Sequence, residues 1–248
     1  MSAASPARAT AAMAAMDLRL AMRRGETLIA TALMPVAVLV FFSSFSIVPT
    51  GAGRPVDFLL PGSIAFAIIA TSLVSLGITT AYDRSYGVLK RLGGSPLSRP
   101  ELLVAKLVTV LVVEAVQVAL LVATSALLLG WVAPAGASLV LAVTSVLLGT
   151  VAFAGLGLLL AGTLRAETML AVANVLFVAS VLLGGIVVPL DQLPAALATF
   201  AAALPASALA DALRVALGGV GDAGGPLVLL TAWGIGAVGL AVATFRWE

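Results

Sequence analysis

The sequence predicts an all-α integral membrane protein with six transmembrane helices, on the strength of its composition, its apolar runs and the placement of its basic residues. Of its 248 residues, 62% are hydrophobic and only 10% are charged. Soluble domains carry roughly 25% charged residues, so this chain has too little charge to cover a surface that faces water. We infer that most of its outer surface faces lipid.

The apolar runs give the expected spans. The hydrocarbon core of a bilayer is roughly 30 Å thick and is crossed by a helix of about 20 apolar residues. We therefore expect a single transmembrane domain over residues 28–248, and we expect the first run to be kept as a span and not removed as a signal peptide. The six runs that meet the length requirement are residues 28–48, 59–81, 102–129, 137–163, 168–188 and 227–245.

The basic residues predict the orientation. If the N-terminus is cytoplasmic, the inner segments hold all Lys and Arg residues except Arg54 and Arg214. Lys and Arg collect in cytoplasmic loops of membrane proteins. Both termini are therefore expected in the cytoplasm, as an even number of spans requires.

The residues that the sequence lacks exclude several functions. It has no cysteine and no histidine, which removes thiol chemistry, the usual zinc sites and histidine bases. A phosphate-binding P-loop needs a Gly-Lys pair, but Lys90 follows Leu89 and Lys106 follows Ala105. No basic domain offers a surface to nucleic acid. The chain is expected not to be an enzyme, to bind no metal or cofactor and to have no nucleic-acid partner.

Residues 1–27 are expected to form a cytoplasmic tail with an interfacial helix. Met13, Met16 and Leu20 fall on one face of this helix, and Arg19 and Arg23 fall on another. This pattern is typical of a helix that lies in the surface of a membrane and contacts lipid. The alternative is a frayed, alanine-rich tail.

The polar segment between the second and third spans predicts a short amphipathic helix on the membrane surface. At 3.6 residues per turn, its apolar and basic side chains fall on different sides. The apolar side carries Tyr82, Tyr86, Leu89 and Leu92. The cations that point elsewhere are Arg84, Lys90 and Arg91. The alternative is an ordinary positively charged loop.

The end of this segment predicts a sharp stop and a new start. Gly93 and Gly94 favour a helix end because glycine accepts left-handed geometry, and Pro96 prevents the helix from resuming. Ser98 suits the N-cap of the third span, and Glu101 three residues later completes a capping box. A rigid helix, a stop and a newly capped span together form an arrangement that transmits motion.

Glu114 is the clear ionisable residue inside the predicted spans. It lies about 18 Å along the helix from Leu102 at 1.5 Å per residue, and a charge at that depth costs a few kcal/mol. Glu114 and the polar residues near it can line a substrate path or couple to protons. The alternative is that Glu114 is protonated, or bonded to Gln117 or to a neighbouring helix, and that the serine and threonine hydroxyls are packing contacts. The other polar residues considered for this path are Gln117, Ser72, Ser75 and Asn174.

Residues 189–225 are expected to form two short helices that dip into or lie on the outer leaflet. Asp191 and Pro194 suit the start of the first helix, and Leu204-Pro205 breaks it. An Asp-Arg pair three residues apart supports the second helix. This second helix is expected to close at Gly218-Gly219. The residues that mark the region are Pro189, Asp191, Pro194, Pro205, Asp211 and Arg214.

Three passages of this six-span pattern resemble one known family. They are residues 58–62 (FLLPG), residues 83–99 (DRSYGVLKRLGGSPLSR) and the outer region that begins at residues 183–190 (LGGIVVPL). In this order the chain resembles the type-2 permease family of ATP-binding-cassette (ABC) exporters, most closely the daunorubicin-resistance-like membrane subunits. One departure is Gly184-Gly185, where the family usually has a serine before the glycine.

The resemblance implies a half-transporter in a bacterial-type cell membrane. Two six-helix permease subunits, identical or sister chains, would pair, and each would dock a separate ATPase subunit that binds ATP and Mg. The segment from Tyr82 to Leu97 would be the coupling helix, flanked by the N-terminal helix. The residues assigned to this coupling are Tyr82, Asp83, Arg84, Tyr86, Gly87, Leu89, Lys90, Arg91, Leu92 and Pro96.

These observations leave three functional hypotheses. The leading one is the permease subunit of an ATP-driven exporter for an amphipathic drug, antibiotic or lipid-like substrate, because few charges line the spans. Such a protein would act in efflux and antibiotic resistance. The alternative is a proton-coupled secondary transporter that uses Glu114. A third is a membrane scaffold that transports nothing.

Overall fold

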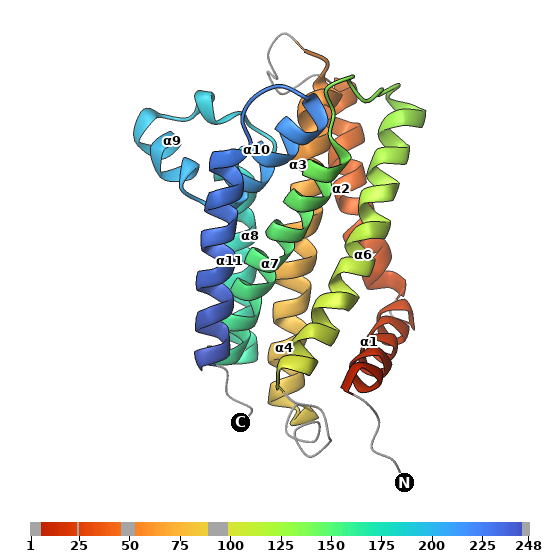
Figure 1. The fold of residues 1–248 in the computed structure, drawn as a ribbon, viewed down its shortest axis with the longest axis vertical. Helices are drawn as coiled ribbons and strands as arrows, with labels where there is room; N and C mark the ends of the chain where they lie inside the picture. The colour runs from red at the N-terminus through yellow and green to blue at the C-terminus, as the bar shows by residue number, and fades with distance from the viewer. Residues whose placement is uncertain (1–5, 24, 46–52, 89–98, 245–248) are drawn as a thin grey trace.

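The computed structural model describes residues 6–23, 25–45, 53–88 and 99–244, and within these ranges the chain forms helices and no strands (Figure 1). The prediction of an all-α membrane fold is confirmed at this level. The elements are α1 (Pro6–Arg23), α2 (Gly25–Phe45), α3 (Pro55–Ile69), the π-helix η1 (Ala70–Ser75), α4 (Leu76–Ser85), α6 (Arg99–Leu128), α7 (Leu139–Thr163), α8 (Ala166–Leu183), the 3-10 helix η2 (Leu190–Gln192), α9 (Ala195–Ala202), α10 (Pro205–Gly218) and α11 (Gly224–Thr244).

The second predicted span is the central helix of the bundle. It runs without a break from Pro55 to Ser85 through α3, η1 and α4, so it is longer than the predicted residues 59–81 at both ends. In its most apolar 18-residue stretch 83% of the residues are buried, against 17–39% in the other long apolar helices. Pro55 suits the first turn because its fixed φ is already helical. This span therefore receives the contacts of the others.

Five helices of the described chain are long and apolar enough to cross a membrane. Counting α9 and α10, which meet at an angle of 79°, as one bent span gives a sixth. The first predicted span, residues 28–48, corresponds to α2, whose apolar part covers Thr31–Phe45 and contains Pro35. Five or six candidate spans agree with an integral membrane protein, and the assignment of α2 as the first span stays a prediction. The five long candidates are Pro55–Ser85, Glu101–Leu128, Leu139–Thr163, Ala166–Leu183 and Gly224–Thr244.

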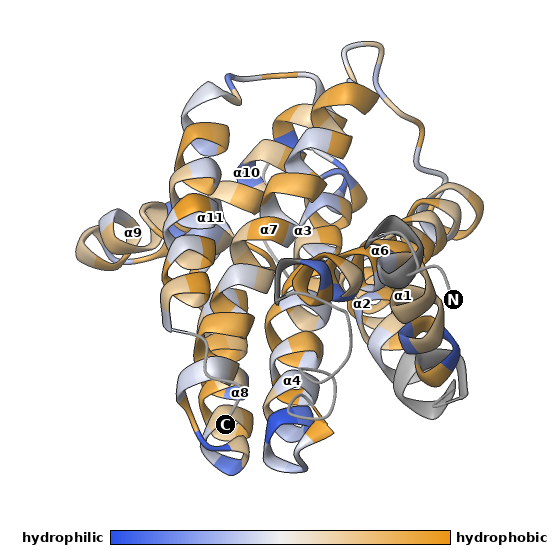
Figure 2. Cartoon of the chain, turned by 60° about the horizontal axis from the view of Figure 1, so that its bottom comes forward, coloured by the Kyte–Doolittle hydropathy of each residue, from blue (hydrophilic) through white to orange (hydrophobic). Residues whose placement is uncertain are grey.

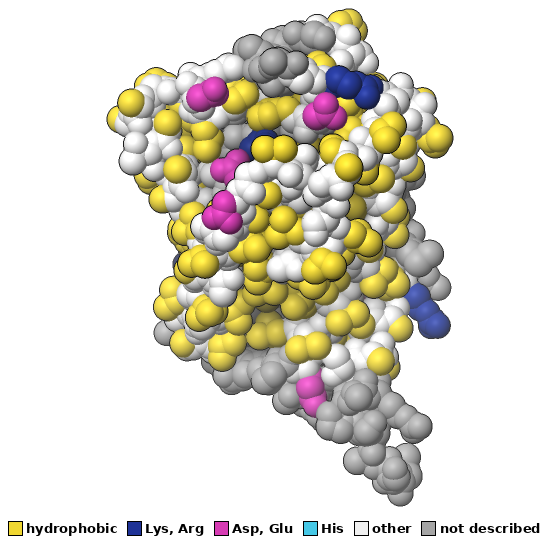
Figure 3. Space-filling view, turned by 45° about the horizontal axis from the view of Figure 1, so that its top comes forward, with side chains coloured by type: hydrophobic (Ala, Val, Ile, Leu, Met, Phe, Trp, Pro, Cys, Tyr) yellow, Lys and Arg dark blue, Asp and Glu magenta, His cyan; other side chains and the backbone are white. Residues whose placement is uncertain are grey.

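The outer surface of the bundle is apolar. Hydrophobic colour runs along most of the length of the helices in Figure 2, and the middle of the surface seen in Figure 3 is almost wholly hydrophobic or uncharged. Large apolar side chains are exposed on α6, α8 and α11, for example Val116, Val175 and Ile235. A soluble monomer rarely exposes apolar patches of this extent. The surface is suited to lipid.

The start of α1, the end of α4 and the end of α11 lie at the same end of the bundle (Figure 1). We call this end the inner end and the opposite one the outer end. An even number of crossings produces this arrangement. The side of the membrane on which the inner end lies is set only by the positive charges of the sequence, and it stays a prediction.

The fifth span is shorter than predicted. Helix α8 ends at Leu183, whereas the sequence suggested residue 188. Gly184 caps the helix, and Gly185 takes the left-handed conformation with φ of 65°. Residues with a Cβ rarely adopt this conformation, so the apolar run continues past the helix without extending it.

The outer region contains two short helices, as the sequence indicated. Pro194 is the N-cap of α9, α10 begins at Pro205, and Gly219 closes α10 in the left-handed conformation. Helix α9 is largely exposed, but α10 is buried between α3, α7 and α11 through Leu209 and Leu213. Helix α10 is therefore part of the core at the outer end. Its depth in the leaflet stays a prediction.

Candidate functional site

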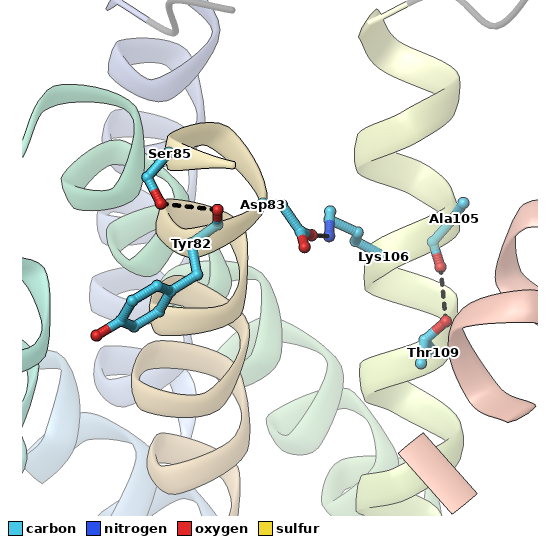
Figure 4. A network of polar contacts seen from close by, with 6 residues as sticks. All are labelled: Tyr82, Asp83, Ser85, Ala105, Lys106 and Thr109. Atoms are coloured by element: carbon cyan, nitrogen blue, oxygen red, sulfur yellow. Dashed lines mark hydrogen bonds and ion pairs between the residues drawn. The ribbon is translucent and has the colours of Figure 1, made fainter. Parts of the chain in front are cut away.

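An ion pair joins the inner ends of the second and third spans. Lys106 Nζ on α6 lies 2.9 Å from Asp83 Oδ2 on α4, and the two side chains face each other across the gap between the helices (Figure 4). The Lys106 side chain is only 6% exposed and that of Asp83 is 30% exposed. A buried lysine needs a nearby opposite charge. Asp83 therefore fixes α4 against α6 at this end.

The neighbouring residue, Arg84, ties α4 to the turn between α7 and α8. Its guanidinium donates to the carbonyl oxygen of Gly162 at 2.5 Å and to the carbonyl oxygen of Leu164. Carbonyls at the end of a helix lack partners within the helix and carry partial negative charge. Arg84 satisfies two such groups at the end of α7. Through Asp83 and Arg84 the second span is thus held on two sides, and we call these two residues and their partners the inner clamp.

The placement of residues 82–88 corrects one expectation. Tyr82, Asp83 and Arg84 were predicted to begin a helix on the membrane surface, but they lie in the last turn of α4, the end of the second span. Tyr82 and Tyr86 stack at 5.9 Å, as expected for one side of a helix, and Gly87 then turns with φ of 68°. Helix α4 continues past its apolar residues because the inner clamp provides partners for the charges of Asp83 and Arg84.

The rest of the predicted coupling segment lies outside the described residues. This holds for the basic pair and for the apolar and proline residues that were expected to shape the helix and its stop, as well as for the N-cap of the third span. These residues are Leu89, Lys90, Arg91, Leu92, Pro96 and Ser98.

Helix α1 packs on α6 close to the inner clamp. Met13 and Ala14 are buried. Thr109 Oγ1 of α6 donates to the carbonyl oxygen of Ala105 at 3.1 Å (Figure 4) and lies 3.4 Å from the carbonyl oxygen of Ala14. Burial raises the pKa of the Asp17 carboxyl above its ordinary value, while the charge of Lys106 lowers it and the charge of Asp83 raises it. Asp17 is thus electrostatically coupled to the ion pair. Helix α1 belongs to the same inner assembly.

We expect the docking of α1 to weaken as the pH rises above about 3.8, the ordinary value for Asp17. The folded-state pKa is raised, so the docked form binds the proton more tightly, and stability is lost between the ordinary and the raised value. The chain has no cysteine, so a single spin label at Met16→Cys, a 47% exposed position, reports the mobile fraction. That fraction should grow with pH in the parent and stay constant in Asp17→Asn; identical curves would contradict the expectation.

A second polar site lies deep in the bundle, between the second, third and fourth spans. Ser72 Oγ donates to Glu114 Oε1 at 2.5 Å, and Thr150 Oγ1 lies 2.5 Å from Glu114 Oε2. Glu114 is 1% exposed. Next to it, Thr71 Oγ1 donates to Gln117 Oε1 at 3.0 Å. We call these five residues the buried polar cluster.

The geometry of the buried polar cluster suits a neutral carboxylic acid. Thr150 Oγ1 also lies 2.8 Å from the carbonyl oxygen of Val146, to which it donates, and a hydroxyl carries only one proton. With the acid protonated, both contacts of Thr150 are satisfied at once. Two ion pairs are present among the described residues, Lys106–Asp83 and Arg214–Asp211, and neither includes Glu114. A neutral form avoids the cost of a buried charge.

The structure brings together only part of the predicted path. Glu114, Gln117 and Ser72 meet, whereas Asn174 is on α8, exposed, and donates to the carbonyl oxygen of Leu170 in its own helix. Ser75 follows Ser72 by three residues and is only half-buried. Thr71 and Thr150 were missed. Thr71 was adjacent to a predicted residue, but only the tertiary contact between α6 and α7 identifies Thr150.

The outer end has its own polar contacts around Arg214. Arg214 Nη1 pairs with Asp211 Oδ1 at 2.9 Å, as the spacing predicted, and Nη2 donates to the carbonyl oxygen of Gly185. The guanidinium also lies 4.0 Å from the centre of the Phe58 ring, a cation–π contact. Arg214 therefore joins α10, the end of α8 and the start of the second span. Pro189 precedes η2 at the same end.

Comparison with known proteins gives one family. The family model described as ABC-2 type transporter matches residues 8–217, which is most of the chain and includes the inner clamp and the buried polar cluster. No curated protein matches the sequence.

Proposed function

The chain belongs to the ABC-2 type transporter family, and from this premise we propose that it is the permease subunit of an ATP-driven exporter. The family places it among the membrane components of ABC transporters. In our proposal a separate subunit binds Mg and hydrolyses ATP, and this chain forms the route through the membrane. Residues 86–98, which follow α4, are the docking segment for that ATPase.

The inner clamp is the observation that carries the proposal. The docking segment directly follows α4, and α4 is held by Asp83 to Lys106 and by Arg84 to the carbonyl oxygens of Gly162 and Leu164. A displacement of the segment therefore acts on the second, third and fourth spans together. This supports a coupling role for Asp83 and Arg84 that differs from direct contact with the ATPase. Tyr86, which is 70% exposed, and the basic residues 90 and 91 are the groups we propose for that contact.

The substrate that fits this chain is amphipathic and carries few charges. The described spans expose mostly apolar side chains, and Glu114 is enclosed within one subunit. A multiply ionised substrate would find no partners there. We propose that two copies, or this chain and a sister permease, form the path between them in a cell membrane, with both termini cytoplasmic. Efflux of a drug, antibiotic or lipid-like molecule is the function that agrees with these features.

The test is to purify the tagged chain from its native membranes and to assay ATPase activity. A soluble ATPase should co-purify in stoichiometric amount and should be lost in the double variant Lys90→Glu with Arg91→Glu. Arg165→Glu, a charge reversal at an exposed inner position on the turn before α8, is the matched control and should retain it. A preparation without ATPase activity, or one that keeps it in the double variant with normal efflux, would contradict the proposal.

The second candidate is a proton-coupled secondary transporter, which the buried carboxyl of Glu114 favours. In that case Glu114→Gln abolishes transport at any ATP level, and uncouplers stop efflux at once. The permease proposal expects efflux in Glu114→Gln, because a glutamine amide accepts from Ser72 and donates to Thr150 in the same geometry.

A further inference from the structure

The second span contains a π-helical turn in the middle of the bundle. In η1 the N–H of Leu76 donates to the carbonyl oxygen of Thr71, five residues back, instead of the four of an α-helix. The turn thus holds one residue more than a regular helix would. Such turns are rare and occur mostly at functional sites. Helix α4, which carries Asp83 and Arg84, takes its rotational position from this extra residue.

Two hydroxyls of η1 bond to another helix and not back into their own helix. Ser and Thr side chains in membrane helices commonly donate to a carbonyl of the preceding turn. Among the described residues, those that do so with the carbonyl four residues back include Thr109, Thr144, Ser145, Thr150, Thr163, Thr199, Thr231 and Thr244. Thr71 and Ser72 donate instead to Gln117 and Glu114 of α6. These two acceptors are three residues apart and share one helix face.

Helix α7 supports η1 from another side. A Cβ on Gly157 would lie 2.8 Å from the carbonyl oxygen of Ser72 and 3.0 Å from that of Leu73. The backbones of the fourth span and of the π-turn are therefore in close contact. Thr150, seven residues earlier on α7, contacts the same Glu114 that accepts from Ser72. The π-turn packs against α6, α7 and α8, and hydroxyls of η1 and α7 converge on Glu114 of α6.

We propose that η1 is the hinge of the second span and that Glu114 and Gln117 are the positioning residues that hold its resting form. This inference rests on the proposed function, since the hinge responds to the docking segment. Converting the π-turn to an α-helical turn shifts α4, on the inner side of the turn, by up to one residue. Such a shift corresponds to about 100° of rotation and 1.5 Å of rise. Asp83 and Arg84 would then leave their partners. A change of η1 from π-helix to α-helix would therefore also open the inner clamp.

Unpaired polar atoms beside the turn agree with a second arrangement. Gln117 Nε2 and Thr80 Oγ1 are buried and have no hydrogen-bond partner in the described part of the chain. An unpaired buried donor costs free energy. Thr80 lies in α4, the half that rotates, so the movement changes its surroundings. Two arrangements with different partners are what a bistable element requires.

The absence of cysteine from the sequence allows the hinge to be measured with pairs of spin labels. The lower pair is Ser85→Cys with Thr244→Cys, and the upper pair is Asp57→Cys with Val228→Cys, all at exposed positions. Both pairs use α11 as reference, which packs along α7. The pairs are measured by pulsed electron resonance in lipid nanodiscs, with and without the bound ATPase and nucleotide. Nucleotide should add a second distance in the lower pair and leave the upper pair unchanged.

Variants of the positioning residues test the hinge in the permease alone. In Glu114→Ala with Gln117→Ala, the second distance of the lower pair should rise without nucleotide from at most about 10% to most of the molecules. Glu114→Gln should behave as the parent. Ser145→Ala, which removes a buried hydroxyl bonded only within α7, is the matched control and should also behave as the parent. If the double variant fails to fold, Ser72→Ala and Thr71→Val remove the same contacts from the other side.

The results separate the hinge from the proposed function. A folded double variant with an unchanged lower pair, or equal shifts in both pairs, overturns the hinge. A shifted lower pair in a protein that binds no ATPase supports the hinge and overturns the proposed function. With the ATPase bound, the double variant should hydrolyse ATP but transport at least tenfold less substrate per ATP. A loss of both activities in the same proportion would indicate a merely structural role.

Discussion

Replacing Gly157 by valine is expected to destabilise the bundle strongly, because this glycine lies against the backbone of the π-turn. The added Cβ alone would meet the carbonyl oxygens of Ser72 and Leu73 at 2.8 and 3.0 Å. These are backbone atoms, so no side chain can rotate away, and the fourth span must move off the second. Overpacking of a tight core commonly costs about 1–3 kcal/mol, and we expect the upper end of that range or more.

The measurement is the midpoint of thermal unfolding in detergent, followed as the loss of the monodisperse peak in size-exclusion chromatography. Gly236→Val is the matched control, because nothing lies within 4 Å of a Cβ at this exposed position on α11. The control should keep the parent midpoint, and Gly157→Val should fall well below it. Equal midpoints would mean that α7 and the π-turn are not in rigid contact.

The elements that the sequence predicted best depend on local chemistry. Apolar length identified the long spans. Leu204-Pro205 identified the break before α10, and the glycine pair at Gly218-Gly219 identified the end of α10. The Asp211–Arg214 pair was likewise a local spacing, and it is present. In each case the residues that set the feature lie within a few positions of it.

The features that escaped prediction depend on contacts between spans. Nothing local distinguishes the π-turn at Ala70–Ser75 from a regular apolar helix, because it is stabilised by Glu114, Gln117 and Gly157 on other helices. The assignment of Tyr82 to a surface helix failed for a similar reason. Charges normally end a span, but here Lys106 and the carbonyl oxygens of the α7–α8 turn neutralise them.

The same contacts explain why the central span is both rigid and movable. A helix that is 83% buried in its apolar stretch cannot slide without breaking many contacts at once, because packed interiors resist small shifts. A local change of helical type avoids this cost: the part above η1 stays in place and only α4 turns. The polar contacts at Glu114 and at Asp83 then determine which of two discrete positions α4 takes.

Reversing the charge of Lys106 to Glu is expected to have the largest effect at the inner end. The variant places two carboxylates at a position where the lysine side chain is 6% exposed, and breaking such a buried pair commonly costs about 3–5 kcal/mol. The single variant Asp83→Lys should be less severe, because the Asp83 side chain is 30% exposed and a lysine there can reach water. Both singles should reduce transport, since each releases α4 from α6.

The double reversal, Lys106→Glu with Asp83→Lys, tests whether stability and transport depend on the interaction between the two charges. It restores opposite charges at the same distance, so it should recover stability and transport beyond the sum of the two single effects. Unfolding midpoints and efflux are measured for all four proteins, with Glu167→Lys, a reversal at an exposed position near the inner end of α8, as the control. Additive effects of the two changes would show that Lys106 and Asp83 act independently. The double variant can also recover stability without recovering transport. In that case the reversed pair holds α4 against α6 but does not let α4 move during the transport cycle, so holding α4 and moving α4 are separate requirements.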